Sequence, residues 1–277
     1  MLIQVGYELA FYCPQDTPMI LMVNVHYSRA SDIVIPDLLI TDPETPINAY
    51  RDGFGNWCTR IVAPTGRIRL TSTGVVRDSG ETDVLTPSAQ QHPLQELPEE
   101  TLVFLLGSRY CETDLLSWAA WSRFGQLTPG WSRVQAICDF VHNHIAFDYQ
   151  KASSTRTAWQ AFNEGVGVCR DYTHLAVALC RCMNIPARYC NGYLGDIGIP
   201  ADPAPMDFNA WFEAYIGDRW YVFDARHNMP RIGRITVARG RDAMDIPMLH
   251  SFGPHVLRRF EVHTEEVVEQ ACQLAAE

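Results

Sequence analysis

One cysteine stands where its surroundings would make it a nucleophile. Residues 165–175 read G-V-G-V-C-R-D-Y-T-H-L, and apolar side chains follow Cys169 at helical spacing as far as Met183. This spacing predicts a buried helix that begins at Cys169. Unpaired amides at a helix N-terminus stabilise a thiolate and lower the cysteine pKa, and they can also hold a developing oxyanion. We therefore predict that Cys169 is a thiol nucleophile.

The alternative for Cys169 is core packing, because a buried free cysteine behaves as a small hydrophobe. The chain has nine cysteines, so cysteine alone singles out no position. Cys180 and Cys182 lie two residues apart and face different sides of the same helix, so they are poor partners for binding one metal ion. The same spacing makes His142 and His144 poor partners too. We expect no metal and no cofactor.

A predicted β-hairpin carries the other groups that the chemistry needs. Glycine and aspartate at 217 and 218, between two strand patterns, indicate a two-residue turn. The resulting register pairs Trp211 with Asp224 and Asn209 with Arg226. Asn209, Trp211 and Asp224 then share one face, with Asn209 and Asp224 diagonal to each other and within side-chain reach.

The two segments together, G-V-C-R-D-Y-T-H-L and D-F-N-A-W-F-E-A-Y…W-Y-V-F-D-A-R, resemble the transglutaminase-like superfamily. The likeness is to bacterial members described as cysteine proteases, and it covers roughly residues 102–252. It implies a papain-like α+β core with a Cys-His-Asp triad, in which Cys169 is the nucleophile and Asp224 the aspartate. The family's histidine precedes Ala-Trp, and this chain has Asn209 there.

Asn209 leaves three explanations open, because an amide does not titrate near neutral pH and general-base help is worth roughly 10²- to 10⁴-fold. Asn209 is a substitution, natural or engineered, that disables an otherwise ordinary enzyme. Alternatively another histidine, His227 or His174, serves as the base. In the third explanation, the chain is a non-catalytic peptide-binding or scaffold protein on this fold.

Two further residues are predicted to bind substrate. Trp211 would line the acyl pocket, and Arg226 would bind a carboxylate through its planar guanidinium. The alternatives are a core aromatic and one arginine of a solvated surface that runs from 226 to 241. The resemblance also implies an aromatic oxyanion donor upstream of the cysteine, for which the candidates are Trp131, Tyr149 and Trp159.

The expected fold class is α+β, with a small sandwich-like all-β domain before the core. Short apolar runs between turn signals predict the β domain over residues 1–85. The stretch T-P-S-A-Q-Q-H-P-L-Q-E-L-P-E-E lacks periodicity and predicts a linker, placed at 86–101. Helical patterns followed by strands predict the α+β domain over 102–277.

Composition restricts the partners and the compartment. The 277 residues carry a net charge of −10 with 47% hydrophobic side chains, which disfavours nucleic acid, anionic membrane and disorder. The odd cysteine count and the absence of a signal-like start favour a reduced, cytoplasmic protein. The expected partner is a peptide or protein whose side-chain or backbone amide Cys169 would attack, with water as the preferred acceptor. The oligomeric state stays open.

Overall fold

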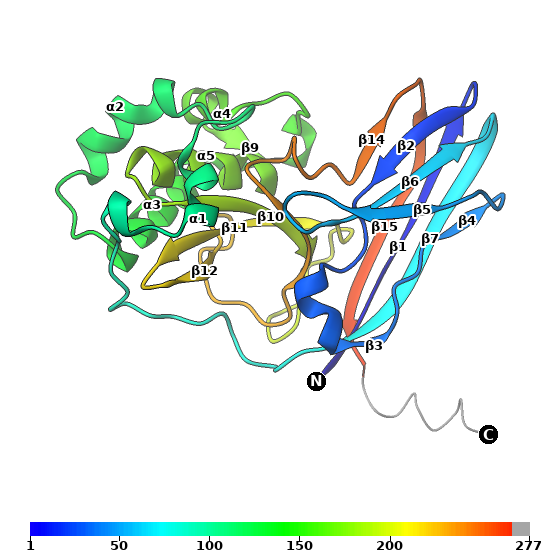
Figure 1. The fold of residues 1–277 in the computed structure, drawn as a ribbon, viewed down its shortest axis with the longest axis horizontal. Helices are drawn as coiled ribbons and strands as arrows, with labels where there is room; N and C mark the ends of the chain where they lie inside the picture. Colours follow the sequence, from blue (N-terminus) through cyan, green and yellow to red (C-terminus); the bar gives the residue numbers. More distant parts are fainter. Residues whose placement is uncertain (268–277) are drawn as a thin grey trace.

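Two antiparallel sheets face each other at one end of the computed structural model, which describes residues 1–267 (Figure 1). One sheet has the order β15-β1-β7-β3 with β4 also on β7, and the other has the order β14-β2-β6-β5. Their strands are β1 (Leu2–Cys13), β2 (Thr17–Leu21), β3 (Ile33–Ile35), β4 (Ile40–Asp42), β5 (Asn48–Arg51), β6 (Trp57–Ala63), β7 (Gly66–Arg77), β14 (Leu249–Ser251) and β15 (Val256–Glu266). Alternate residues of β1 are buried between the sheets, as the period of two requires.

The C-terminal boundary of the predicted second domain is wrong. The prediction assigned residues 102–277 to the α+β domain, but β15 pairs with β1 from Ile3 opposite Glu266 to Tyr12 opposite Val256. β14 likewise pairs with β2. Most of β15 is exposed, so its sequence lacks the alternation that would have revealed a strand of the first sheet. The last residues of that prediction, 268–277, lie outside the described part of the chain.

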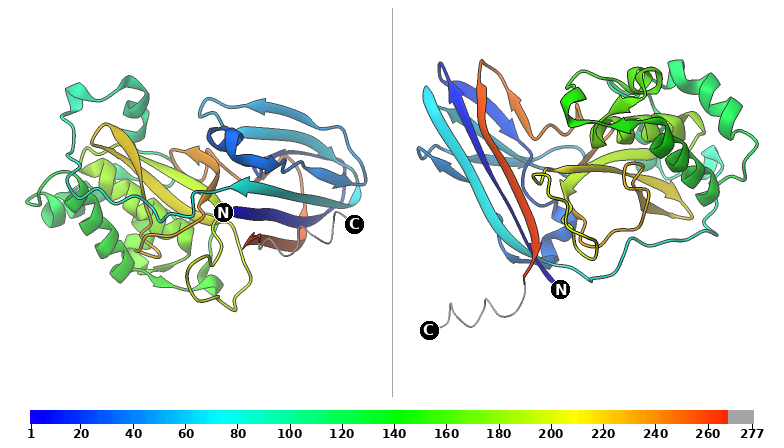
Figure 2. Two further views of the ribbon diagram at one scale, coloured as in Figure 1. Left: turned by 90° about the horizontal axis from the view of Figure 1, so that it is seen from below. Right: turned by 180° about the vertical axis from the view of Figure 1, so that it is seen from behind.

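The second half of the molecule is a four-stranded sheet covered by helices on one face (Figures 1 and 2). The sheet has the order β12-β11-β10-β13, all antiparallel, with β10 (Ala187–Tyr193), β11 (Asn209–Ile216), β12 (Arg219–Phe223) and β13 (Ile235–Gly240). The helices are α1 (Glu99–Leu102), α2 (Thr113–Phe124), α3 (Trp131–His144), α4 (Ala158–Glu164) and α5 (Cys169–Cys182). The α+β class is confirmed.

Helix α5 is the centre of this half. Nearly all of its side chains are buried, and its apolar residues share a core with α2, α3 and the β11 residues Phe212 and Ala214. The short parallel pair β8 (Ala146–Phe147) and β9 (Val166–Gly167) lies just before its first turn. The predicted hairpin is confirmed, since Ile216 lies opposite Arg219 and Phe212 opposite Phe223.

The two halves share a second hydrophobic core. Ile3 and Leu9 of the sandwich belong to the same buried cluster as Tyr193, Phe208 and Ile235 of the other half. The stretch predicted as a linker packs against the second half of the molecule. The Gly217 amide at the hairpin turn donates a hydrogen bond to the carbonyl of Gln90, and the Trp131 amide at the start of α3 donates one to the carbonyl of Ala89. No helix within residues 1–267 is both long and apolar enough to cross a membrane.

Candidate active site

Cys169 is the first residue of α5, as the periodicity predicted. The carboxylate of Asp171 accepts a 2.9 Å hydrogen bond from the Val168 amide and a 3.2 Å ion pair from Arg156. This contact holds the strand β9 against the helix start, and a Cβ at Gly167 would lie 2.6 Å from the Asp171 Cβ. The Cys169 amide is one of the four that a helix leaves without an intrahelical partner.

The predicted lowering of the Cys169 pKa is wrong. Burial raises the pKa of the thiol to about 11, the nearby Arg226 acts against this rise, and Asp207 adds to it. Water is excluded by side chains from other segments, and the cost of desolvating a thiolate exceeds what the single guanidinium returns. The resting thiol is therefore neutral at physiological pH.

The sulfur nevertheless opens onto a cavity of about 240 Å³. Of the cysteines within residues 1–267, Cys169 alone is partly exposed. Asp207 and Asn209 line the same cavity, and no histidine lines it among the described residues. Asp207 was missed by the sequence reasoning, although it precedes Asn209 by two positions and so lies on the same side of an extended chain.

Asn209 begins β11 and occupies the position beside Cys169 that the prediction gave it. Its Oδ1 accepts a 3.2 Å hydrogen bond from Nη1 of Arg226. Its Nδ2 donates to the carbonyl of Asp207 at 3.2 Å. The guanidinium of Arg226 also lies over the Phe147 ring, 4.0 Å from its centroid. Arg226 is thus positioned at the site by contacts on two sides.

Asp224 is fully enclosed and bonds to His227 rather than to Asn209. Its Oδ2 lies 2.8 Å from Nδ1 of His227 and 2.9 Å from Nη2 of Arg234. Its Oδ1 accepts the amides of Arg226 and His227, each at 3.0 Å. Burial alone would raise the pKa of Asp224, but Arg234 and His227 hold it well below its usual value. Asp224 is connected to Asn209 through Arg226.

The two histidines proposed as substitute bases lie in different places. His227 lines a smaller cavity with Asn209 and Arg226, adjoining the one that holds Cys169. His174 is fully buried, accepts the Ala243 amide at its Nε2 at 3.1 Å, and has a pKa lowered far below its usual value, chiefly by burial. His174 is therefore a structural group, whereas His227 is at the edge of the site.

Trp211 does not line the Cys169 cavity, contrary to the prediction that it forms the acyl pocket, and neither do the arginines of residues 226–241. Trp211 is 1% exposed and lines a separate cavity with Arg234, whose guanidinium lies 5.2 Å from the ring centroid. Arg231 and Arg234 are buried, so this stretch is not the solvated surface that was the alternative expectation. Of these arginines, Arg226 is the one that the structure places beside Asn209 and Cys169.

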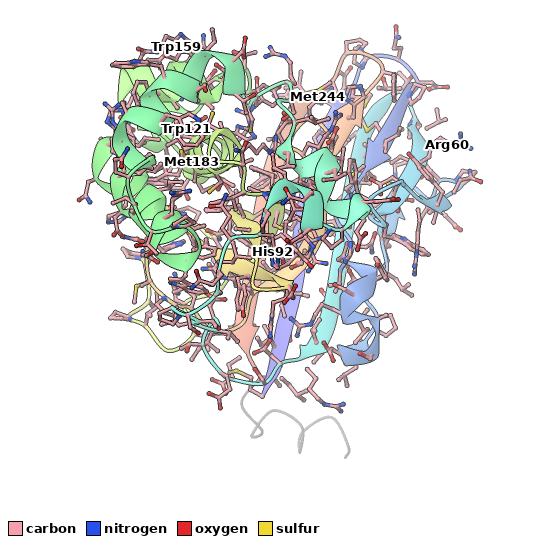
Figure 3. All side chains as sticks on the ribbon, turned by 60° about the vertical axis from the view of Figure 1, so that its left-hand side comes forward. Arg60, His92, Trp121, Trp159, Met183 and Met244 are labelled. Carbon is pink, nitrogen blue, oxygen red and sulfur yellow. The ribbon has the colours of Figure 1, made fainter. Side chains whose placement is uncertain are left out.

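The structure distinguishes the three upstream aromatic candidates. Trp131 packs against Tyr221 and Phe223 in the core. Trp159 stacks on Phe162 at the outer side of the helices (Figure 3). Tyr149 lines the cavity that contains Asn209 and Arg226, and burial raises its pKa, with Arg226 opposing and Cys169 adding to the rise. Of the three candidates, Tyr149 is the one that lies near enough to Cys169 for the two groups to affect each other's ionisation.

Residues 121–225 match the Transglutaminase-like superfamily, and this part of the chain forms a transglutaminase-like core, as its two motifs predicted. The crystal structure of a candidate cysteine protease from Cytophaga hutchinsonii is similar over 96% of this chain and 90% of that chain, with 29% identity and a TM-score of 0.82. The uncharacterized protein ML0607 of Mycobacterium leprae is 25% identical over 80% of this chain and 81% of its own length.

Proposed function

We propose that this chain carries a cysteine acyl-transfer site that hydrolyses a peptide or carboxamide bond through a Cys169 thioester, with its rate limited by Asn209. One observation carries the proposal. Cys169 begins a helix, opens onto a cavity shared with Asn209, and lies close enough to Asp224 and Arg226 for their charges to act on its pKa. This is the placement that the family's nucleophile, base and acid would need.

The reaction balances without a cofactor. Sγ of Cys169 attacks the carbonyl carbon, the C–N bond breaks, and the amine leaves with the proton that the thiol loses. Water then cleaves the C–S bond, which releases a carboxylic acid and restores the thiol. The Cys169 amide would stabilise the negative oxygen that forms on the carbonyl, and the hydroxyl of Tyr149, which lines the adjoining cavity, would be a second donor. The proton transfer is the step that Asn209 cannot assist.

The second candidate is a non-catalytic peptide-binding protein on the same fold. Asn209 and the raised pKa of Cys169 favour it, because both leave the thiol without activation. A weakly active enzyme that uses His227 as its base lies between the two. The 2.8 Å contact between Nδ1 of His227 and Oδ2 of Asp224 favours that version, since the carboxylate would orient the imidazole.

The test compares the chain as given with Asn209→His on a panel of peptides and glutamine substrates, with Cys169→Ser as the inactive control. A gain of about 10²- to 10⁴-fold in kcat/KM, lost in the double variant with Cys169→Ser, supports a limited enzyme. Equal activity in both chains that His227→Gln abolishes would identify His227 as the base. Peptide binding without turnover in either chain would favour the binding protein.

A further inference from the structure

The cavity at Cys169 has a composition that selects among substrates. Its walls are mostly apolar, and they come from β10, from the residues around β11 and from the segment that follows β13: Tyr189, Phe208, Ala210, Ala243, Ile246, Pro247 and Met248. A concave, largely apolar site with a few placed polar groups is the usual form of a ligand pocket. The sulfur of Cys169 is one of those polar groups.

The wall formed by residues 241–248 is fixed in place from both halves of the molecule. Asp242 is buried and accepts the Tyr110 amide at 2.8 Å, and the Ala243 amide donates to His174 of α5. At the other end, Met22 of the sandwich side donates its amide to the carbonyl of Met248 at 3.1 Å. Met244 projects from this segment between the helices and the sandwich (Figure 3). The pocket is therefore preformed, and the sandwich helps to hold it.

One wall carries an unpaired acceptor. Asn191 of β10 is 7% exposed and lines the cavity, and its Nδ2 contacts the carbonyl of Ile246 at 3.4 Å. Its Oδ1 has no hydrogen-bond partner among residues 1–267. A buried acceptor without a donor is costly, so buried amides are normally satisfied on both sides. A bound substrate that carries an N–H would supply the missing donor.

The charge around the cavity disfavours an acidic occupant. Asp207 lines the cavity, and its own pKa is raised, chiefly by burial. The guanidinium of Arg170, which also lines it, is already bonded to the carbonyls of Ser153 and Ser154. A second carboxylate here would lose its hydration and meet Asp207, while Arg226 lies outside the lining of this cavity and already bonds Asn209.

We propose that this cavity is the acyl-side specificity pocket of the Cys169 site, and that it takes a large apolar side chain whose backbone N–H donates to Oδ1 of Asn191. The substrate class is thus a peptide with a residue such as leucine, phenylalanine or methionine at the carbonyl that Cys169 attacks. This inference rests on the proposed function, because it assumes that Cys169 reaches a substrate carbonyl.

The first experiment measures covalent labelling, which needs no turnover. N-acetyl-amino-acid chloromethyl ketones with leucine, glycine or glutamate side chains are compared with iodoacetamide, and the modified residue is mapped by mass spectrometry. Cys272 lies outside the described residues, so a Cys272→Ser background is used. We expect Cys169 to react at least tenfold faster with the leucine reagent than with the glycine or glutamate reagent.

The outcomes separate the two proposals. Labelling by iodoacetamide with no preference among the three side chains would overturn the pocket and leave the nucleophile standing. No labelling of Cys169 by any reagent would overturn the proposed function itself, and the pocket with it.

Two neighbouring substitutions test the position of the pocket. Ala243→Phe fills part of the cavity, and we expect it to abolish the leucine preference, measured as the ratio of leucine-reagent to glycine-reagent labelling so that a general loss of access to Cys169 cancels. Met244→Phe is the matched control, because Met244 is 51% exposed and does not line the cavity. A leucine preference that survives Ala243→Phe in a folded protein would place the selecting surface elsewhere.

Asn191 is tested with a reagent that lacks the donor. We expect the N-acetyl-leucine reagent to react about tenfold faster than its N-methyl counterpart in the chain as given. Asn191→Leu, which has no acceptor, should lose this difference, and Asn191→Asp, which keeps one, should retain it. An undiminished difference in Asn191→Leu would contradict the role of Asn191 and would be visible even if Ala243→Phe failed to fold.

Discussion

The guanidinium of Arg226 donates a 3.2 Å hydrogen bond to Oδ1 of Asn209, directly beside the Cys169 cavity. Arg226 is also the charge that most lowers the pKa of Cys169 against the effect of burial. In a Cys-His-Asp triad, one imidazole takes the thiol proton and then carries the positive charge. In this chain the amide of Asn209 and the guanidinium of Arg226 occupy that position together. The cation supplies attraction for a thiolate but no proton acceptor.

Removing this cation should make the thiol harder to ionise. In Arg226→Gln the pKa of Cys169 rises further, so alkylation at pH 8.5 should fall about threefold to tenfold, with the rate profile moved to higher pH, since one pKa unit is tenfold in thiolate. The rate of iodoacetamide labelling against pH measures this. Arg219→Gln, at an exposed arginine over the Tyr221 ring, is the control and should not change the profile. An unmoved profile in Arg226→Gln would contradict the assignment.

Tyr149 should act on the transition state and not on folding. In the Asn209→His background, Tyr149→Phe should lower kcat by about 10²-fold with little change in KM, as loss of one oxyanion donor does. Trp159→Phe replaces an indole that stacks on Phe162 outside the site with a smaller ring, and kcat of this variant should stay unchanged. Equal kcat values for the two variants would remove Tyr149 from the mechanism.

The sequence correctly predicted the features that local patterns determine. The helix start at Cys169 followed from apolar spacing after two glycines, and the hairpin register followed from the two-residue turn at 217 and 218. These features depend on residues close together in the chain, so their signals are short in range. They also carried the two family motifs.

The predictions that were wrong concern features that depend on residues far apart in sequence. The pKa of Cys169 is raised chiefly by burial, and the walls around it, Tyr189 and residues 243–248 among them, come from segments distant in sequence whose approach no local pattern predicts. The pairing of β15 with β1 joins the two ends of the chain, and β15 has too few buried positions to indicate it. Arg234, the residue just before β13, contacts Asp224, and no spacing rule predicts this ion pair.

Asp224 should make the fold sensitive to acid. Its folded pKa is held below its ordinary value near 3.9, so its stabilising effect is fully present above that value and is lost as the pH falls toward the folded pKa. Asp224→Asn should cost about 3 kcal/mol in the free energy of unfolding at pH 7, because Arg234 and His227 lose a buried charge partner. Urea unfolding at several pH values measures this.

The pH dependence of this stability cost distinguishes Asp224 from an exposed aspartate. The cost of Asp224→Asn should shrink progressively as the pH falls below about 4, because the chain as given then begins to lose the same interaction. Asp218→Asn, at a turn aspartate whose side chain is 91% exposed, should show no such pH dependence. A cost for Asp224→Asn that stays constant down to about pH 2 would show that Asp224 is not the group that acid titrates.

Gly167 should tolerate no side chain, because its backbone lies against the carboxylate that fixes the start of α5. A Cβ there would come 2.6 Å from the Asp171 Cβ and Oδ2, so Gly167→Ala should lower the free energy of unfolding by about 1–3 kcal/mol. It should also slow the leucine-reagent labelling of Cys169 more than iodoacetamide labelling, because the helix start must shift. Gly53→Ala is the control, since a Cβ at Gly53 meets nothing within 4 Å. Equal stability of the two variants in urea unfolding would mean that the contact between β9 and Asp171 does not position Cys169.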